Sequence, residues 1–196
     1  MPLAAPTSRF DAAAYLDWEA HQPEKHEYLA GEVFAMAGAS RAHATIALNV
    51  ATALRNHLRG GPCSVFISDM KLHVQADDAF YYPDVFVTCA ESDRVQDQYM
   101  SAPSLVVEIL SPSTSAYDRG GKFASYRKLP TLREYVLIDP ERLSVDLFRR
   151  HEDGHWILYP AEAGQTVAFD SVGLSLPIET LYEDVDLQPG QAARHP

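Results

Sequence analysis

Hydrophobic residues recur at helical spacing in two stretches near the start of the chain. The first stretch predicts a helix from about Asp11 to His21, which ends before Pro23 because proline cannot continue a helix. The second predicts a helix from about Ala42 to Leu58, with an apolar stripe along one face. Between them, the segment EYLAGEVFAM alternates around a glycine, which predicts a β-hairpin with its turn at Ala30 and Gly31.

The middle of the chain holds strands of two kinds. From Lys71 to Gln75 polar and apolar residues alternate, which is typical of a strand with one face in water. The runs Pro83–Cys89 and Leu105–Leu110 are almost continuously apolar, as in central strands that are covered on both faces. The pattern predicts further strands at Val65–Ser68, Tyr135–Ile138, Val145–Arg149, Trp156–Tyr159 and Val167–Phe169, and helices at about Ala116–Lys128 and Ile178–Tyr182.

This order of elements predicts a mixed α/β fold, with helices flanking one central mixed sheet and extra strands near the carboxyl end. A chain of 196 residues is expected to form a single domain over residues 1–196. Its 46% hydrophobic and 22% charged residues are ordinary for a globular protein and exclude a mostly disordered or collagen-like chain. No stretch approaches the ~20 apolar residues that cross a bilayer, so no membrane partner is expected.

Charge is distributed unevenly along the chain. The net charge of −11 argues against broad affinity for nucleic acids, because phosphate binding depends on Lys and Arg. Residues 151–196 hold eight acids and one base and form an acidic carboxyl-terminal extension. Residues 117–133 hold five bases and one acid, so we expect Arg119, Arg127 and Lys128 in this segment to face the phosphates of DNA.

The cysteines indicate the compartment. Cys63 and Cys89 are the two cysteines of the chain, and they do not form a CxxC motif. A disulfide framework or a structural zinc site is therefore not expected. We predict reduced thiols and a cytoplasmic protein.

Two carboxylates interrupt the most apolar runs. Asp84 lies within YYPDVFV and Glu108 within LVVEIL. An unpaired buried carboxylate costs several kcal/mol, and two on neighbouring strands also repel each other. A divalent cation would remove both problems, and hard oxygen ligands favour Mg²⁺ or Mn²⁺. Alternatively, each acid lies at a strand end and reaches water.

The helix that follows Glu108 carries polar residues at regular spacing. Asp118, Lys122 and Tyr126 are four residues apart and therefore share one face. This face either is solvated, with an ordinary Asp118–Lys122 pair, or carries functional groups. Gly120 and Gly121 each cost this helix about 1 kcal/mol relative to alanine, which indicates close packing or close approach of a ligand.

Seven stretches, read together, are similar to a known family. In order they are EYLAGEVFAMAGA, His43, SDMK, YPDVFV, LVVEILSPST, DRGGKFASY and LREYVLID. With these the chain resembles the Uma family of restriction-endonuclease-like proteins, a branch of the PD-(D/E)XK nuclease superfamily. The resemblance covers a nuclease-like core at about residues 27–150.

The resemblance implies a restriction-endonuclease-like central mixed sheet and a metal-dependent site that hydrolyses phosphodiester bonds. It implies that Asp84 is the aspartate of the PD motif and Glu108 the glutamate of the E-x-K motif. Glu32 is expected to supply a further acidic metal ligand. The position of the E-x-K lysine is Leu110 in this chain, which cannot stabilise a phosphate charge.

These observations lead to three hypotheses. The first is a Mg²⁺-dependent DNA endonuclease in which Asp84 and Glu108 hold the metal and Lys122 replaces the lysine missing at position 110. For this, the helix near Ala116 must fold back over the face of the sheet that carries Glu108. The second is a nucleic-acid-binding or regulatory protein that retains the fold without cleavage, and the third is an interaction protein with an acidic tail. A homodimer is compatible with the first hypothesis, since one metal site cuts one strand.

Overall fold

A computed structural model describes residues 10–36 and 38–187 of the chain. The helices are α1 (Ala12–Glu19), α2 (Arg41–His57), α3 (Ser115–Tyr117) and α4 (Phe123–Tyr126), and a π-helical turn, Asp118–Lys122, joins α3 to α4. The strands are β1 (His26–Leu29), β2 (Glu32–Ala35), β3 (Ser64–Ile67), β4 (Lys71–Val74), β5 (Ala79–Tyr81), β6 (Val85–Thr88), β7 (Tyr99–Met100), β8 (Pro103–Ile109), β9 (Glu134–Ile138), β10 (Ser144–Arg150), β11 (Trp156–Glu162), β12 (Thr166–Phe169) and β13 (Leu174–Pro177). Short 3₁₀ turns follow β4, β6 and β13 at Gln75–Asp77, Glu91–Val95 and Ile178–Tyr182.

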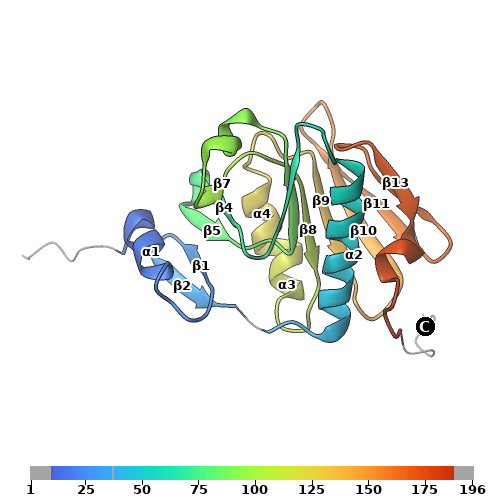
Figure 1. The fold of residues 1–196 in the computed structure, drawn as a ribbon, viewed down its shortest axis with the longest axis horizontal. Helices are drawn as coiled ribbons and strands as arrows, with labels where there is room; N and C mark the ends of the chain where they lie inside the picture. The colour runs from blue at the N-terminus through green and yellow to red at the C-terminus, as the bar shows by residue number, and fades with distance from the viewer. Residues whose placement is uncertain (1–9, 37, 188–196) are drawn as a thin grey trace, which may run out of the picture.

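The central sheet is mixed, as the sequence predicts (Figure 1). Its six strands run in the order β11-β10-β9-β8-β6-β3, with β8 parallel to β9 and the other neighbours antiparallel. The sequence did not predict the second sheet, in the order β2-β1-β5-β4-β7, or the separate β12–β13 hairpin. The second sheet forms because the amino-terminal hairpin pairs with β5 rather than standing alone, with Tyr28 opposite Phe80.

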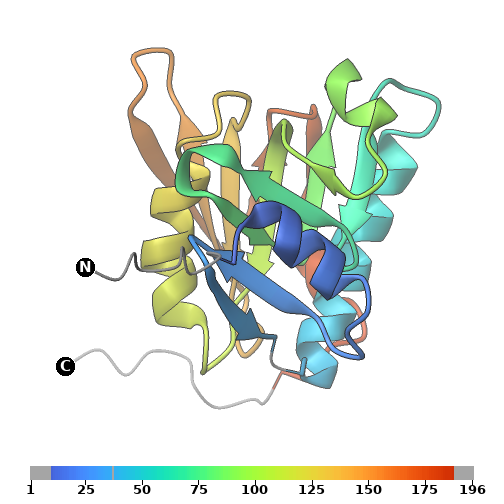
Figure 2. The same ribbon diagram turned by 90° about the vertical axis from the view of Figure 1, so that its left-hand side faces the viewer.

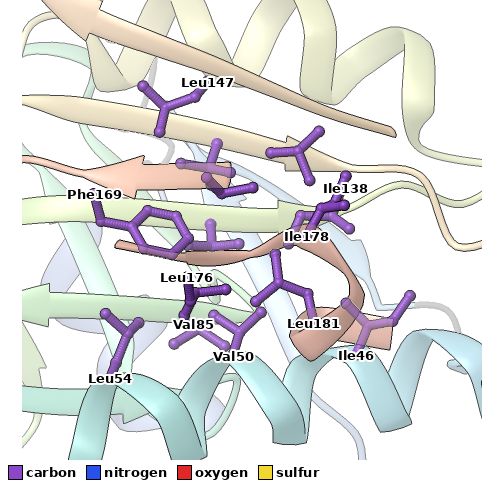
Figure 3. Packing of buried hydrophobic residues seen from close by; sticks show 14 of the residues in the cluster. Ile46, Val50, Leu54, Val85, Ile138, Leu147, Phe169, Leu176, Ile178 and Leu181 are labelled. Atoms are coloured by element: carbon purple, nitrogen blue, oxygen red, sulfur yellow. The ribbon is translucent and has the colours of Figure 1, made fainter. Parts of the chain in front are cut away.

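Both faces of the central sheet are covered. Val85 and Val107, on β6 and β8, pack against the buried stripe of α2 (Figure 3). Phe86 and Val106, one residue along each strand, point to the opposite face and pack with side chains of α4 and the second sheet. This two-sided burial explains why the two strands are almost continuously apolar.

The carboxyl-terminal part of the chain contributes to the same core. Phe169, Leu176, Ile178 and Leu181 are buried in one cluster with the side chains of α2 (Figure 3). In the described chain, no helix is long and apolar enough to cross a membrane.

The cysteines differ from the expectation of two free thiols, because Cys63 and Cys89 form a disulfide. Strands β3 and β6 are antiparallel, and Ser64 lies opposite Thr88. Cys63, just before Ser64, therefore lies opposite Cys89, just after Thr88, at a separation that a disulfide can bridge. The 26-residue spacing in the sequence carries no sign of this pairing.

A buried carboxylate fastens the carboxyl-terminal hairpin to the central sheet. Glu134, at the start of β9, is fully buried and accepts hydrogen bonds from Arg149 Nε at 2.8 Å, Asp170 N at 3.1 Å and Ser171 N at 2.9 Å. The side chain of Glu134 thus satisfies donors from β10 and from the turn after β12, which would otherwise be left without partners.

We expect Glu134→Ala to lower the free energy of unfolding by about 3 kcal/mol, because it leaves a partly buried guanidinium and two backbone donors without this acceptor. The control is Glu162→Ala, an exposed glutamate on β11, which should change stability by less than about 0.5 kcal/mol. Denaturant titration measures both values. Equal effects of the two substitutions would contradict this role of Glu134.

Candidate active site

A cavity of about 1610 Å³ opens beside the end of β8. In Figure 2 the β1–β2 hairpin lies in front, with α3 and α4 (yellow) to one side and α2 (cyan) to the other. The hairpin, α2, α3 and the π-helical turn all contribute lining residues. The ionisable residues that line the cavity are Glu27, Asp84, Glu108, Asp118, Glu141 and Asp186, together with His43 and Lys122.

Asp84 and Glu108 meet in this cavity. Val85 pairs with Val107 across β6 and β8, so Asp84, just before Val85, lies opposite Glu108, just after Val107. Asp84 N donates to Glu108 Oε2 at 3.4 Å, and Ile109 N donates to Asp84 Oδ2 at 2.7 Å. The structure therefore brings together the two acids that interrupt the apolar runs.

Lys122 is the cation at the centre of the cavity. Its Nζ lies 2.9 Å from Glu27 Oε1, 3.3 Å from Glu108 Oε1 and 3.6 Å from Asp118 Oδ1, and its side chain is 8% exposed. The helix folds back over the Glu108 face of the sheet, so the proximity expected from the sequence is confirmed. Its catalytic role stays a prediction.

The face shared by Asp118, Lys122 and Tyr126 is buried rather than solvated. Tyr126 donates its hydroxyl hydrogen to Glu108 Oε1 at 2.9 Å, which fixes the carboxylate from a second side. Leu110, at the motif lysine position, is buried in the apolar cluster with Tyr126 and contributes only an apolar side chain to the cavity wall.

The cavity holds more negative than positive charge. Three carboxylates, from Glu27, Glu108 and Asp118, surround the single Lys122 ammonium. Burial lowers the pKa of Lys122, but the three carboxylates outweigh it and raise that pKa well above its usual value. Burial raises the pKa of Glu108 to about 8, an effect that Lys122 partly offsets and that Asp84 and Asp118 reinforce. The Glu108 carboxyl therefore holds a proton near neutral pH while the lysine stays charged.

Asp118 carries an unsatisfied polar atom. Its side chain is 3% exposed, and its Oδ1 is buried without a hydrogen-bond partner. Burial raises the pKa of Asp118, and Lys122 partly offsets this rise. Lys122 Nζ lies 3.6 Å from this oxygen, beyond hydrogen-bond distance, so the oxygen can still accept a hydrogen bond or bind a cation.

His43 contacts Asp84 from the first turn of α2. Its Nε2 lies 3.2 Å from Asp84 Oδ2. Burial lowers the pKa of His43, but the hydrogen bond to Asp84 and the charge of Asp84 raise it by more, so the net shift of this pKa is upward. No local pattern in the sequence places His43 in a cavity rather than on the surface. The one indication of a functional role for His43 was its presence among the family-like stretches.

Glu27, and not Glu32, is the acid of the β1–β2 hairpin that lines the cavity. In the β1–β2 hairpin Glu27 lies opposite Phe34, and Glu32 lies opposite Leu29 beside the turn. Glu27, at the end away from the turn, lines the cavity, whereas Glu32 is exposed and does not. The signal that could have found Glu27 is its place at the open end of the hairpin, where the chain returns toward the sheet.

Of the basic segment 117–133, Lys122 lines the cavity, whereas the three residues expected to contact DNA do not. Arg119 forms an ion pair with Asp146 on β10 at 2.6 Å, and Lys128 pairs with Asp77. Arg127 is exposed, with its guanidinium 5.0 Å from the centre of the Phe123 ring. None of these three basic residues lines the cavity, so the structure does not bring them together with Asp84 and Glu108.

A central mixed sheet with Asp84 just before β6, Glu108 on the adjacent β8 and Lys122 beside them is the arrangement expected of a restriction-endonuclease-like protein. The chain belongs to the Uma2 family, described as "Putative restriction endonuclease", whose model matches residues 12–179. It is similar to two uncharacterized proteins of Synechocystis, slr1290 and sll1609. The first is 40% identical over 91% of this chain and 94% of its own length, and the second 34% identical over 81% and 90%.

A solved structure has the same fold. It is described as a putative nuclease belonging to DUF820 from Anabaena variabilis, with a TM-score of 0.69 at 20% identity. The similarity covers 86% of this chain and 97% of that one. The family and fold expected from the sequence are thus confirmed.

We expect the unfolding free energy without divalent cations to fall by about 2–4 kcal/mol as the pH rises from 4.5 to 8. Over this range Glu108 ionises in the unfolded chain but keeps its proton in the folded one, whose pKa is about 8. Each unit of pKa difference corresponds to about 1.4 kcal/mol. In Glu108→Gln this contribution should disappear. Denaturant titrations in chelator at both pH values measure it, and an unchanged pH slope in the variant would refute the assignment.

Proposed function

We propose that the protein hydrolyses phosphodiester bonds of DNA with the help of Mg²⁺ or Mn²⁺. The observation that carries the proposal is the meeting of Asp84, Glu108 and Lys122 in one cavity of a nuclease-family fold. Two acids and a lysine are the groups needed to hold a hard cation and to offset the charge of a phosphate in the transition state.

The residues present fit a divalent cation. Once Glu108 has lost its proton, three carboxylates face one ammonium and two negative charges remain unbalanced, and Asp118 Oδ1 has no hydrogen-bond partner. Among the residues that the structure describes, no three His, Cys, Asp or Glu side chains are already grouped as a metal centre. Magnesium does not require such a group, because it keeps several waters and binds through one or two carboxylates together with substrate phosphates.

Asp84 and Glu108 would hold the cation, which when bound supplies Lewis acidity and lowers the pKa of a coordinated water. The Glu108 carboxyl must give up its proton before it can serve as a ligand. Lys122 would donate a hydrogen bond to the attacking water or to a phosphate oxygen, which is the role of the lysine missing at position 110.

Three further residues would act by positioning these groups. His43 orients Asp84 through the 3.2 Å contact, and Tyr126 orients Glu108 through its hydroxyl. Glu27, on β1 of the second sheet, holds the Lys122 ammonium at 2.9 Å. Such partners fix ligand geometry and commonly affect activity without touching the substrate.

The proposal extends to the surroundings of the site. Arg127, which is exposed, and its neighbours Arg119 and Lys128 would contact DNA phosphates outside the cavity. One cavity cuts one strand, so a cut through both strands of a duplex would need the homodimer considered from the sequence. The cytoplasmic location loses the support that it drew from reduced thiols, because Cys63 and Cys89 form a disulfide.

We expect Mn²⁺-dependent nicking of supercoiled plasmid and of single-stranded circular DNA, with loss of at least about a hundredfold in Lys122→Ala. Lys25→Ala, which removes a surface lysine paired with Asp69, is the control and should cleave at the wild-type rate. Gel assays with and without chelator measure the rates. Cleavage by Lys122→Ala at the wild-type rate would refute the lysine's role. DNA binding without cleavage by any form would favour the non-catalytic alternative.

Calorimetric titration with Mn²⁺ tests the metal ligands directly. Asp84→Ala and Glu108→Ala should each weaken binding by about tenfold or more, because each removes one of the few protein ligands. Glu32→Ala should leave the affinity unchanged, since Glu32 does not line the cavity. Lys122→Ala should bind Mn²⁺ nearly as well as wild type. Equal affinities for wild type and both acid variants would contradict the proposed site.

A further inference from the structure

Two exposed aromatic rings line the cavity beside the acidic cluster. Tyr117, the last residue of α3, is 40% exposed, and Phe34, on β2, is 48% exposed. Large aromatic side chains are usually buried, because each removes a large apolar area from water. Rings left open on the wall of a charged cavity are available to a flat apolar partner.

The Tyr117 ring lies in a space that a glycine provides. A Cβ built on Gly121 would lie 2.3 Å from Tyr117 Cε2, so any other residue there would displace the ring. At neighbouring Gly120 a Cβ would meet nothing within 4 Å. The close packing expected from this glycine pair is thus located at Gly121.

The same ring is connected to the centre of the site. The hydroxyls of Tyr117 and Tyr81 are 3.4 Å apart, and Lys122 Nζ lies 5.8 Å from the centre of the Tyr81 ring. Tyr117 also directly precedes Asp118 in the chain. A group stacked on Tyr117 would therefore lie within one or two nucleotides of a phosphate held near Lys122.

The cavity is poorly equipped to clamp the phosphates of an intact duplex. Duplex binding depends largely on neutralising phosphates with Lys and Arg. Among the residues that the structure describes, Lys122 is the one lysine and no arginine lines the cavity, and the Lys122 charge is already shared by three carboxyl groups. The neutral hydroxyls of Ser111, Ser113 and Thr114 also line it. Binding energy here must come from contacts other than charge.

We infer that the substrate is single-stranded or locally unpaired DNA, with an unpaired base stacked on Tyr117. Stacking on an aromatic side chain contributes to single-strand binding without regard to sequence, and a base in a duplex has both faces covered by its neighbours. An unpaired strand also needs only one cavity to be cut. The inference rests on the proposed function for the cleavage step, whereas the stacking contact can be tested by binding alone.

The test compares two single strands of equal length and charge, one of thymidine nucleotides and one of abasic nucleotides. Their affinities for the full chain are measured by fluorescence anisotropy in Ca²⁺, so that the measurement does not depend on cleavage. The wild type should bind the thymidine strand about tenfold more tightly than the abasic strand. Binding driven by charge alone would give equal affinities.

The variants assign this preference to the ring. Tyr117→Ala should abolish the preference for bases, and Tyr117→Phe, which keeps the ring, should restore most of it. Tyr159→Ala is the matched control, because Tyr159 is 44% exposed on β11 and does not line the cavity. Gly121→Ala should act like Tyr117→Ala, while Gly120→Ala should retain the preference.

The outcomes for stacking and for cleavage are distinguishable. Equal binding of the two strands by the wild type, or an unchanged preference in Tyr117→Ala, would overturn the stacking inference even if DNA is cleaved. A base preference that depends on Tyr117, without cleavage of any DNA, would support stacking and refute the proposed hydrolysis. Cleavage of intact linear duplex as fast as of single strands would contradict the substrate class.

Discussion

The contact between Lys122 and three carboxylates is the interaction on which the architecture of the site depends. Glu27 comes from the amino-terminal hairpin, Glu108 from the central sheet and Asp118 from the helical turn, so one ammonium holds three separate parts of the fold together. Without that cation, every ionised carboxylate of the group would be a buried, unpaired charge, which costs far more than a surface ion pair gains. The hairpin therefore completes the site as well as covering the sheet, and its position is linked to the charge state of the cavity.

Periodicity alone predicted most of the central sheet, because its middle strands are covered on both faces and read as apolar runs. The second sheet was missed because the pairing of Tyr28 with Phe80 joins residues 52 positions apart, and no local pattern encodes such a pairing. The disulfide was missed for the same reason. Cys63 and Cys89 become neighbours only through the register of β3 and β6, whereas composition describes each cysteine separately.

The site residues that could be predicted are those that interrupt a local pattern of the sequence. Asp84 and Glu108 stand out because a charge inside an apolar strand needs a partner, and Lys122 followed from helix geometry once Leu110 had removed the expected lysine. Glu27 and His43 break no pattern, since an acid in a hairpin and a histidine at a helix start are both common on surfaces. The sequence therefore reveals residues whose burial would cost free energy within their own segment. It does not reveal residues whose role arises only from contacts made in the tertiary fold.

The charge distribution also limits how a nucleic acid can be held. A chain with a net charge of −11, and with six acids against one lysine along its cavity, repels a polyanion until cations reduce that charge. A divalent cation between Asp84 and Glu108 would reverse the local field at the point where the reacting phosphate must lie, while the aromatic wall at Tyr117 adds attraction that salt does not screen. On this view, metal loading and substrate binding are coupled in the same cavity, and each binds poorly without the other. By thermodynamic reciprocity, DNA must then increase the affinity for the metal by the same factor as the metal increases the affinity for DNA.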